Sequence, residues 1–143
     1  MGICACAGPA FLVLWDIVAQ EPGSLRSALS GYGLAGRSWW VFVIYYATVH
    51  PVLEECYWRG YLASDSPRPA AIDLTFAGYH ALVLPHFIRA PWVVLACGVL
   101  FLTAWGWRRL AQKCGGLGIP IVSHAAADLS LVFAVELIAR RGA

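Results

Sequence analysis

The sequence HPVLEECYWRGY (residues 50–61) ends the apolar run from Trp39 to Leu53, and it places two adjacent carboxylates and an arginine within six residues. A charge at the centre of a bilayer costs about 2.5–3.5 kcal/mol on the lowest scales, so three such side chains together need a reason. Glu55 and Arg59 are four residues apart, the better orientation for a helical ion pair. Glu54 lies about 100° around the same helix. The spacing predicts a neutralised Glu55 and leaves Glu54 for chemistry.

The composition around this stretch is that of an integral membrane protein. Of the 143 residues, 60% are hydrophobic and 13% are charged, whereas soluble domains are about 45–50% apolar and about 25% charged. We therefore expect an all-α, polytopic membrane helix bundle of about five transmembrane helices, forming a single transmembrane domain over residues 1–143. The net charge of +2 is mild and the basic residues are scattered, which argues against a nucleic-acid partner. The five cysteines form no C-x-x-C pair, so no zinc-finger spacing or disulfide framework is indicated.

The apolar runs give the expected positions of the helices. The runs that we expect to span the membrane cover residues 3–19, 39 to 61 or 62, 70–87, 92–107 and 119–139. Polar, Gly- and Pro-rich stretches at 20–38 and 63–69 are typical of loops, the first with room for a short interfacial helix. Residues 1–6 lack the basic region of a signal peptide, and we interpret them as the edge of the first spanning helix.

Two further polar pairs lie within expected helices. Phe76 and His80 are four residues apart, as are His124 and Asp128, so each pair shares one helix face. Ionisable side chains inside membrane helices normally face one another in the bundle interior. Glu54, His80, His124 and Asp128 together would have the chemistry to activate a water molecule.

The pattern E-E-x-x-x-R, then F-x-x-x-H, then H-x-x-x-D, on successive apolar helices, resembles the CPBP family of intramembrane proteases. That family includes CAAX prenyl endopeptidases and the abortive-infection proteins, and the resemblance covers about residues 39–139. It implies that Glu54 is the general base that activates water, helped by His80. His124 and Asp128 would stabilise the oxyanion or bind a metal. Glu55, Arg59 and Phe76 would support the structure of the site.

The resemblance leaves the cofactor open between none and a divalent metal such as zinc, held by Glu54, His80, His124 and Asp128. Two histidines and carboxylates are acceptable zinc ligands, but the sequence has no H-E-x-x-H signature. We therefore favour the metal-free glutamate mechanism. An ionised Asp128 would repel an oxyanion, so it must be protonated, orient His124 or bind a cation. His50 and His86 lie outside the three motifs, and the roles of both stay open.

The expected function is an intramembrane endopeptidase that cleaves a membrane-associated protein or peptide, with the lipid bilayer as its surroundings. A bacterial cytoplasmic membrane is the expected location, and the oligomeric state stays open. The alternative is a non-enzymatic immunity or partner-binding membrane protein of the same fold. A proton-relay or transport subunit would also use intramembrane Glu and His, but the chain has no repeat and too few helices for alternating access.

Overall fold

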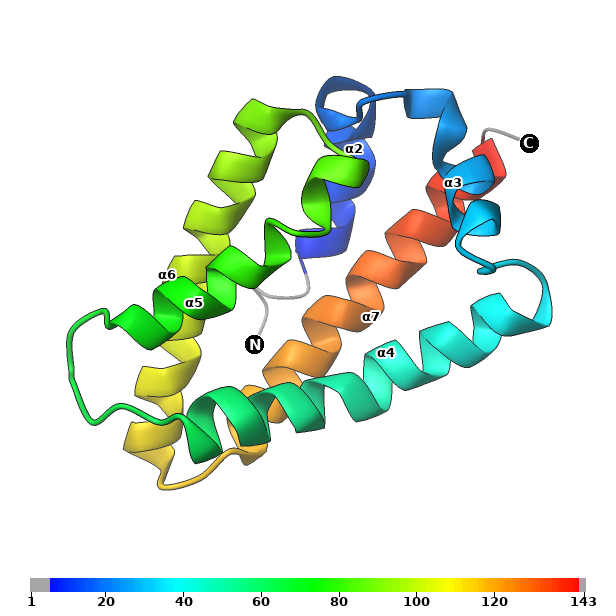
Figure 1. Ribbon diagram of the computed structural model, residues 1–143. Coiled ribbons are helices and arrows are strands. Elements are labelled where there is room, and N and C mark those ends of the chain that lie inside the picture. Colours follow the sequence, from blue (N-terminus) through cyan, green and yellow to red (C-terminus); the bar gives the residue numbers. More distant parts are fainter. Residues whose placement is uncertain (1–5, 142–143) are drawn as a thin grey trace. The chain divides into compact units, whose positions relative to one another are not determined.

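The computed structural model describes residues 6–141, and all of its regular elements are helices (Figure 1). The described residues contain no β-strand, which confirms the all-α class. The elements are α2 (Ala7–Val18), η1 (Pro22–Ser24), α3 (Leu25–Gly31), α4 (Arg37–Glu55), η2 (Cys56–Tyr61), α5 (Ala71–His80), η3 (Leu84–His86), α6 (Ala90–Cys114) and α7 (Gly118–Arg141). The chain forms two compact units, one of residues 1–52 and 122–143 and the other of residues 53–121.

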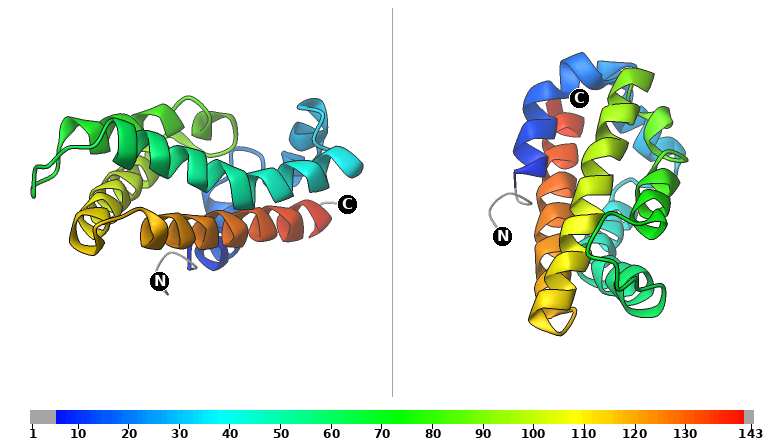
Figure 2. Two further views of the ribbon diagram at one scale, coloured as in Figure 1. Left: turned by 90° about the horizontal axis from the view of Figure 1, so that it is seen from below. Right: turned by 90° about the vertical axis from the view of Figure 1, so that its left-hand side faces the viewer.

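The first unit contains α2, α3, most of α4 and nearly all of α7, and α2 closely approaches α7 at Gly8. The backbone N–H of Gly8 donates to Ser130 Oγ at 3.1 Å. A Cβ at Gly8 would lie 2.0 Å from the backbone oxygen of Ser130, so only glycine permits this approach. The two helices lie side by side in the right-hand view of Figure 2.

The second unit is built on α5 and α6, which pack against each other. Asp73 accepts a hydrogen bond from the backbone N–H of Ala70 at the start of α5. Its two carboxylate oxygens also accept from Arg108 Nε and Nη2 at 3.0 and 2.7 Å. The Arg108 guanidinium further donates to the backbone oxygens of Ser64, Ser66 and Arg68. Because Arg108 is only 2% exposed, a single buried cation joins both helices to the loop before α5.

Helix α4 changes its winding where the carboxylates lie. It remains α-helical through the buried Pro51 to Glu55 and then continues as the π-helix η2 to Tyr61. The expected continuous helix from Trp39 to Tyr61 is therefore confirmed. π-Helical turns occur mostly as short insertions, frequently at functional sites.

Helix α5 differs from its expected span. It ends at His80, followed by a turn and η3, so the expected single helix over residues 70–87 is wrong beyond His80. Pro85 explains why the α-helix does not continue through this segment, because Pro85 has no N–H to donate to Ala81 O and its ring would clash with that carbonyl. The 10 residues of α5 reach about 15 Å, half the thickness of a bilayer core.

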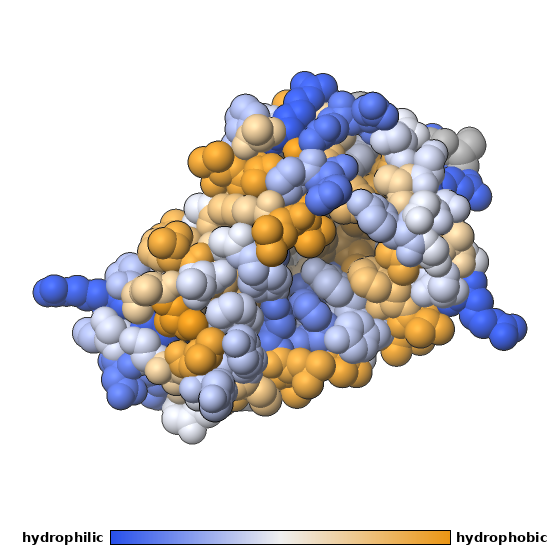
Figure 3. All heavy atoms as spheres, in the orientation of Figure 1, coloured by the Kyte–Doolittle hydropathy of each residue, from blue (hydrophilic) through white to orange (hydrophobic). Residues whose placement is uncertain are grey.

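Within residues 6–141, two helices are long and apolar enough to cross a membrane by length and composition, α6 with 25 residues and α7 with 24. The expectation of about five transmembrane helices is not confirmed; α2, with 12 residues, is a shorter apolar helix. Large apolar side chains are exposed on several helices, such as Ile44 at 64%, Val94 at 74% and Phe133 at 64%. Hydrophobic residues are spread widely over the visible surface (Figure 3), which is typical of side chains that face lipid. The expected first span begins at residue 3, and its residues 3–5 lie outside the described residues, as does most of the expected helix edge at residues 1–6.

Candidate active site

The ion pair expected from the E-E-x-x-x-R spacing is present at the junction of α4 and η2. Arg59 Nη1 donates to Glu55 Oε1 at 3.0 Å, and both side chains are buried, with 2% and 0% exposure. The guanidinium lies over the Phe76 ring at 4.2 Å and the Trp107 ring at 5.3 Å. Aromatic faces stabilise a cation, and an arginine is more weakly hydrated than a lysine. Phe76 thus supports Arg59, which in turn neutralises Glu55.

Glu54 lies in the same unit and its carboxylate meets α5. Tyr79 donates its hydroxyl proton to Glu54 Oε1. The Tyr79 ring is also in contact with the next residue, His80, with ring centroids 4.1 Å apart. His80 Nδ1 lies 2.9 Å from the backbone oxygen of Phe76. Because a carbonyl oxygen can only accept, Nδ1 carries a proton, and in the neutral form of the ring Nε2 is the acceptor.

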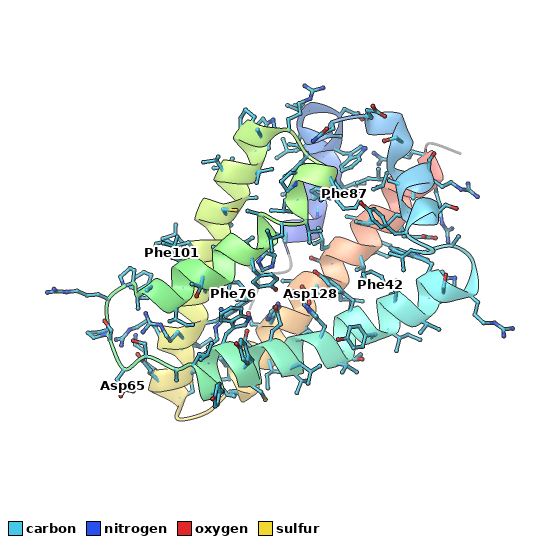
Figure 4. The ribbon with its side chains drawn as sticks, in the orientation of Figure 1. Phe42, Asp65, Phe76, Phe87, Phe101 and Asp128 are labelled. Carbon is cyan, nitrogen blue, oxygen red and sulfur yellow. The ribbon has the colours of Figure 1, made fainter. Side chains whose placement is uncertain are left out.

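The first unit holds a second polar cluster, which joins α7 to α4. Asp128 Oδ1 lies 3.7 Å from His124 Nε2, and Oδ2 lies 3.4 Å from His50 Nδ1. The two imidazole rings are 6.3 Å apart. His50 also stacks on Tyr46 at 4.7 Å, which fixes the plane of its ring. Asp128 points from α7 toward α4 (Figure 4), so one carboxylate contacts two histidines.

The comparisons with known proteins agree with the motifs. A family model described as "Type II CAAX prenyl endopeptidase Rce1-like" matches residues 36–130, about two thirds of the chain. This chain belongs to that family. No curated protein and no solved structure gives a significant match.

Membership in the Rce1-like family confirms the resemblance to the CPBP intramembrane proteases. It supports protease activity of the CAAX type and a membrane-associated protein or peptide as substrate. The matched region begins just before α4 and ends in α7. It therefore contains both polar clusters and all three motifs of this Rce1-like chain.

The residues of the second cluster are of the types that bind a divalent metal. Two imidazole nitrogens and a carboxylate are common zinc ligands, with bonds of about 2.0–2.2 Å that place tetrahedral donors roughly 3.3 Å apart. The separations of 3.4 and 3.7 Å from His50 and His124 run to the two different carboxylate oxygens of Asp128, so they do not define one tetrahedral set of donors. Glu54 and His80, which also belong to the expected metal set, are in the other unit.

Several contacts in the Rce1-like chain were not expected from its motifs. His50, whose role the sequence left open, contacts Asp128. Tyr79 stands within the F-x-x-x-H motif, yet its contact with Glu54 bridges 25 residues of sequence. His86 is exposed in η3, and its Nδ1 lies 3.1 Å from the backbone oxygen of Val83. The one signal that the sequence offered for Tyr79 was its position directly before His80, the histidine of the second motif.

Proposed function

We propose that this chain hydrolyses a peptide bond in a membrane-associated protein or peptide, using a water molecule activated by Glu54. The supporting observation is the setting of Glu54. The buried Glu55–Arg59 pair fixes the helix turn next to it, and Tyr79 donates a hydrogen bond to its carboxylate. A general base must be held within hydrogen-bond reach of the proton that it removes. Glu54, next to that ion pair, is the carboxylate to which we assign this role.

In the proposed reaction, Glu54 removes a proton from water while the water oxygen attacks the carbonyl carbon of the substrate. The resulting tetrahedral intermediate collapses, the C–N bond breaks, and the proton held by Glu54 passes to the leaving amine. His80 accepts a hydrogen bond from the same water at Nε2, because its Nδ1 proton is engaged by Phe76 O. The reaction consumes only the substrate and one water molecule.

His124 and Asp128 are proposed to stabilise the oxyanion of that intermediate. An ionised Asp128 would repel the oxyanion directly, so it acts through His124, 3.7 Å away, by fixing the orientation of that ring. The imidazole N–H is then the donor to the oxyanion. Hydrogen-bond donors placed where negative charge develops are worth about 2.7–4 kcal/mol each in acyl-transfer enzymes. His50 and Glu54 are one turn apart on α4, so this helix carries residues of both clusters.

The metal-free mechanism is the one that we propose, because the H-E-x-x-H signature of zinc peptidases is absent. Where a zinc ion is bound instead, His124 and Asp128 would hold it, with Glu54 and His80 as the further expected ligands. The metal would then polarise the scissile carbonyl and lower the pKa of the attacking water. Exhaustive dialysis against a chelator distinguishes the metal-free mechanism from the zinc-dependent one. Protease activity that survives the dialysis supports the metal-free glutamate mechanism.

We place the site in a bundle of about five membrane helices in a bacterial cytoplasmic membrane. Helix α4 supports this count as a third span beside α6 and α7, since its 19 residues reach about 28 Å before η2 extends it. Helices α2 and α5 would enter the membrane only in part, as their 12 and 10 residues require. Substrates that reach the site laterally would be membrane-bound.

The experiment that tests the proposal uses the purified full chain in liposomes, with a prenylated CAAX peptide, its unprenylated form and an apolar membrane peptide as probes. Mass spectrometry identifies the fragments. Glu54→Gln should lower kcat about a thousandfold, within the range for a lost general base. Glu136→Gln is the matched control, because Glu136 pairs with the exposed Arg140 on α7. A wild-type protein that binds these peptides without cleaving them would contradict the proposal and favour a partner-binding protein.

A further inference from the structure

Tyr79 is the contact of Glu54 that the motifs do not assign. It lies on α5 between the Phe76 and His80 positions of the second motif, and its hydroxyl donates to Glu54 Oε1. The ring is half-buried, and a tyrosine in an apolar bundle normally finds a partner for its O–H. That partner here is the carboxylate proposed as the general base.

The tyrosine ring is held on several sides. Trp58 stacks on it with centroids 5.7 Å apart and planes inclined by 5°. His80 contacts it at 4.1 Å, and Phe76 meets it edge-on at 5.8 Å and 87°. With its plane fixed in this way, the ring can deliver the hydroxyl to one place only. An aromatic residue kept for packing alone would need no hydroxyl at that place.

We propose that Tyr79 is a positioning residue for Glu54, a role that rests on the proposed function. By donating to Oε1, the tyrosine fixes the rotation of the carboxylate and directs Oε2 toward the attacking water. The donor also keeps Oε1 from competing for the water proton. The carboxylate is thereby preorganised, which lowers the reorganisation needed in the transition state without adding to substrate binding.

The test is Tyr79→Phe, which keeps the ring and its stacking but removes the hydroxyl. A hydrogen bond to a charged group corresponds to roughly a tenfold to hundredfold effect. We expect kcat to fall by that factor with KM within twofold of the wild-type value, because the lost interaction does not bind substrate. In a Glu54→Gln background, the same substitution should cause no further loss. Tyr61→Phe is the control, since Tyr61 is 82% exposed on the neighbouring π-helix.

Wild-type kcat in Tyr79→Phe, or a raised KM with kcat kept, would overturn this role while leaving the proposed function intact. A wild-type chain without protease activity would instead contradict the proposed function. The contact itself is tested independently of activity by thermal unfolding in detergent of the wild type, Tyr79→Phe, Glu54→Gln and the double variant. We expect the double variant to lose less stability than the sum of the single losses, and strictly additive losses would overturn the hydroxyl–carboxylate contact.

Discussion

At the scale of single residues, His50 contacts Asp128, a contact that its position in the sequence did not predict. Replacing His50 by Phe keeps an aromatic ring against Tyr46 but removes the nitrogen 3.4 Å from Asp128. Residues that orient an active-site group typically contribute ten- to hundredfold. We expect kcat to fall by about that factor in the liposome assay, with unfolding unchanged. The control is His86→Phe, which changes an exposed histidine and should keep wild-type activity. Wild-type activity in His50→Phe would contradict a role of His50 in orienting Asp128.

The buried pair Glu55–Arg59 and the exposed pair Glu136–Arg140 have the same i,i+4 spacing and allow a matched comparison. Glu55→Gln leaves a cation without its counter-charge between two aromatic rings. It should therefore lower the free energy of unfolding by about 3–5 kcal/mol. Glu136→Gln removes a pair whose arginine is 67% exposed and should cost only about 0.3–0.5 kcal/mol. Chemical unfolding in detergent measures both, and equal losses would show that Glu55 is not the structural carboxylate.

Contacts between residues close in sequence could be predicted, and contacts between distant residues could not. The Glu55–Arg59 pair, the Phe76–His80 ring contact and the proximity of His124 to Asp128 all follow from helical periodicity. The Asp73–Arg108 pair joins residues 35 positions apart. Such a pair depends on how α5 packs against α6, which no local pattern encodes. No pattern in the sequence indicated that these two side chains meet.

At the scale of helices, Gly8 controls the packing of α2 against α7. Gly8→Ala would place a Cβ 2.0 Å from the Ser130 backbone oxygen, so α2 must shift. Overpacking of this kind typically costs about 1–3 kcal/mol. Gly98→Ala on α6 is the control, because no atom lies within 4 Å of its Cβ position and alanine favours a helix interior by about 1 kcal/mol. We expect the two variants to shift the unfolding midpoint in opposite directions, and a stabilised Gly8→Ala would contradict the packing.

Most helices could be predicted from apolar runs, but the type of helix and the residues at which helices end were harder to predict. The run from Trp39 to Tyr61 is helical, yet the change to a π-helix after Glu55 has no signal in the periodicity. The end of α5 at His80 was missed because the apolar residues continue beyond it. Pro85 was the local signal, since a proline removes a helical hydrogen bond and restricts the residue before it.

For the protein as a whole, we propose that the cluster around Glu54 and the cluster around His124 serve one hydrolytic step. Residues that act on the same transition state have effects that do not multiply, because removing one of them already abolishes the step that the other assists. Independent sites, by contrast, give additive changes in activation free energy. This difference can be measured without any assumption about the substrate beyond its cleavage.

The most direct measurement is therefore the kcat/KM of wild type, Glu54→Gln, His124→Ala and the double variant on one cleaved membrane peptide. We predict that Glu54→Gln lowers kcat/KM about a thousandfold, that His124→Ala lowers it about a hundred- to thousandfold, and that the double variant is no worse than Glu54→Gln. Full activity in His124→Ala, or a double variant whose loss is the product of the two single losses, would contradict a shared site.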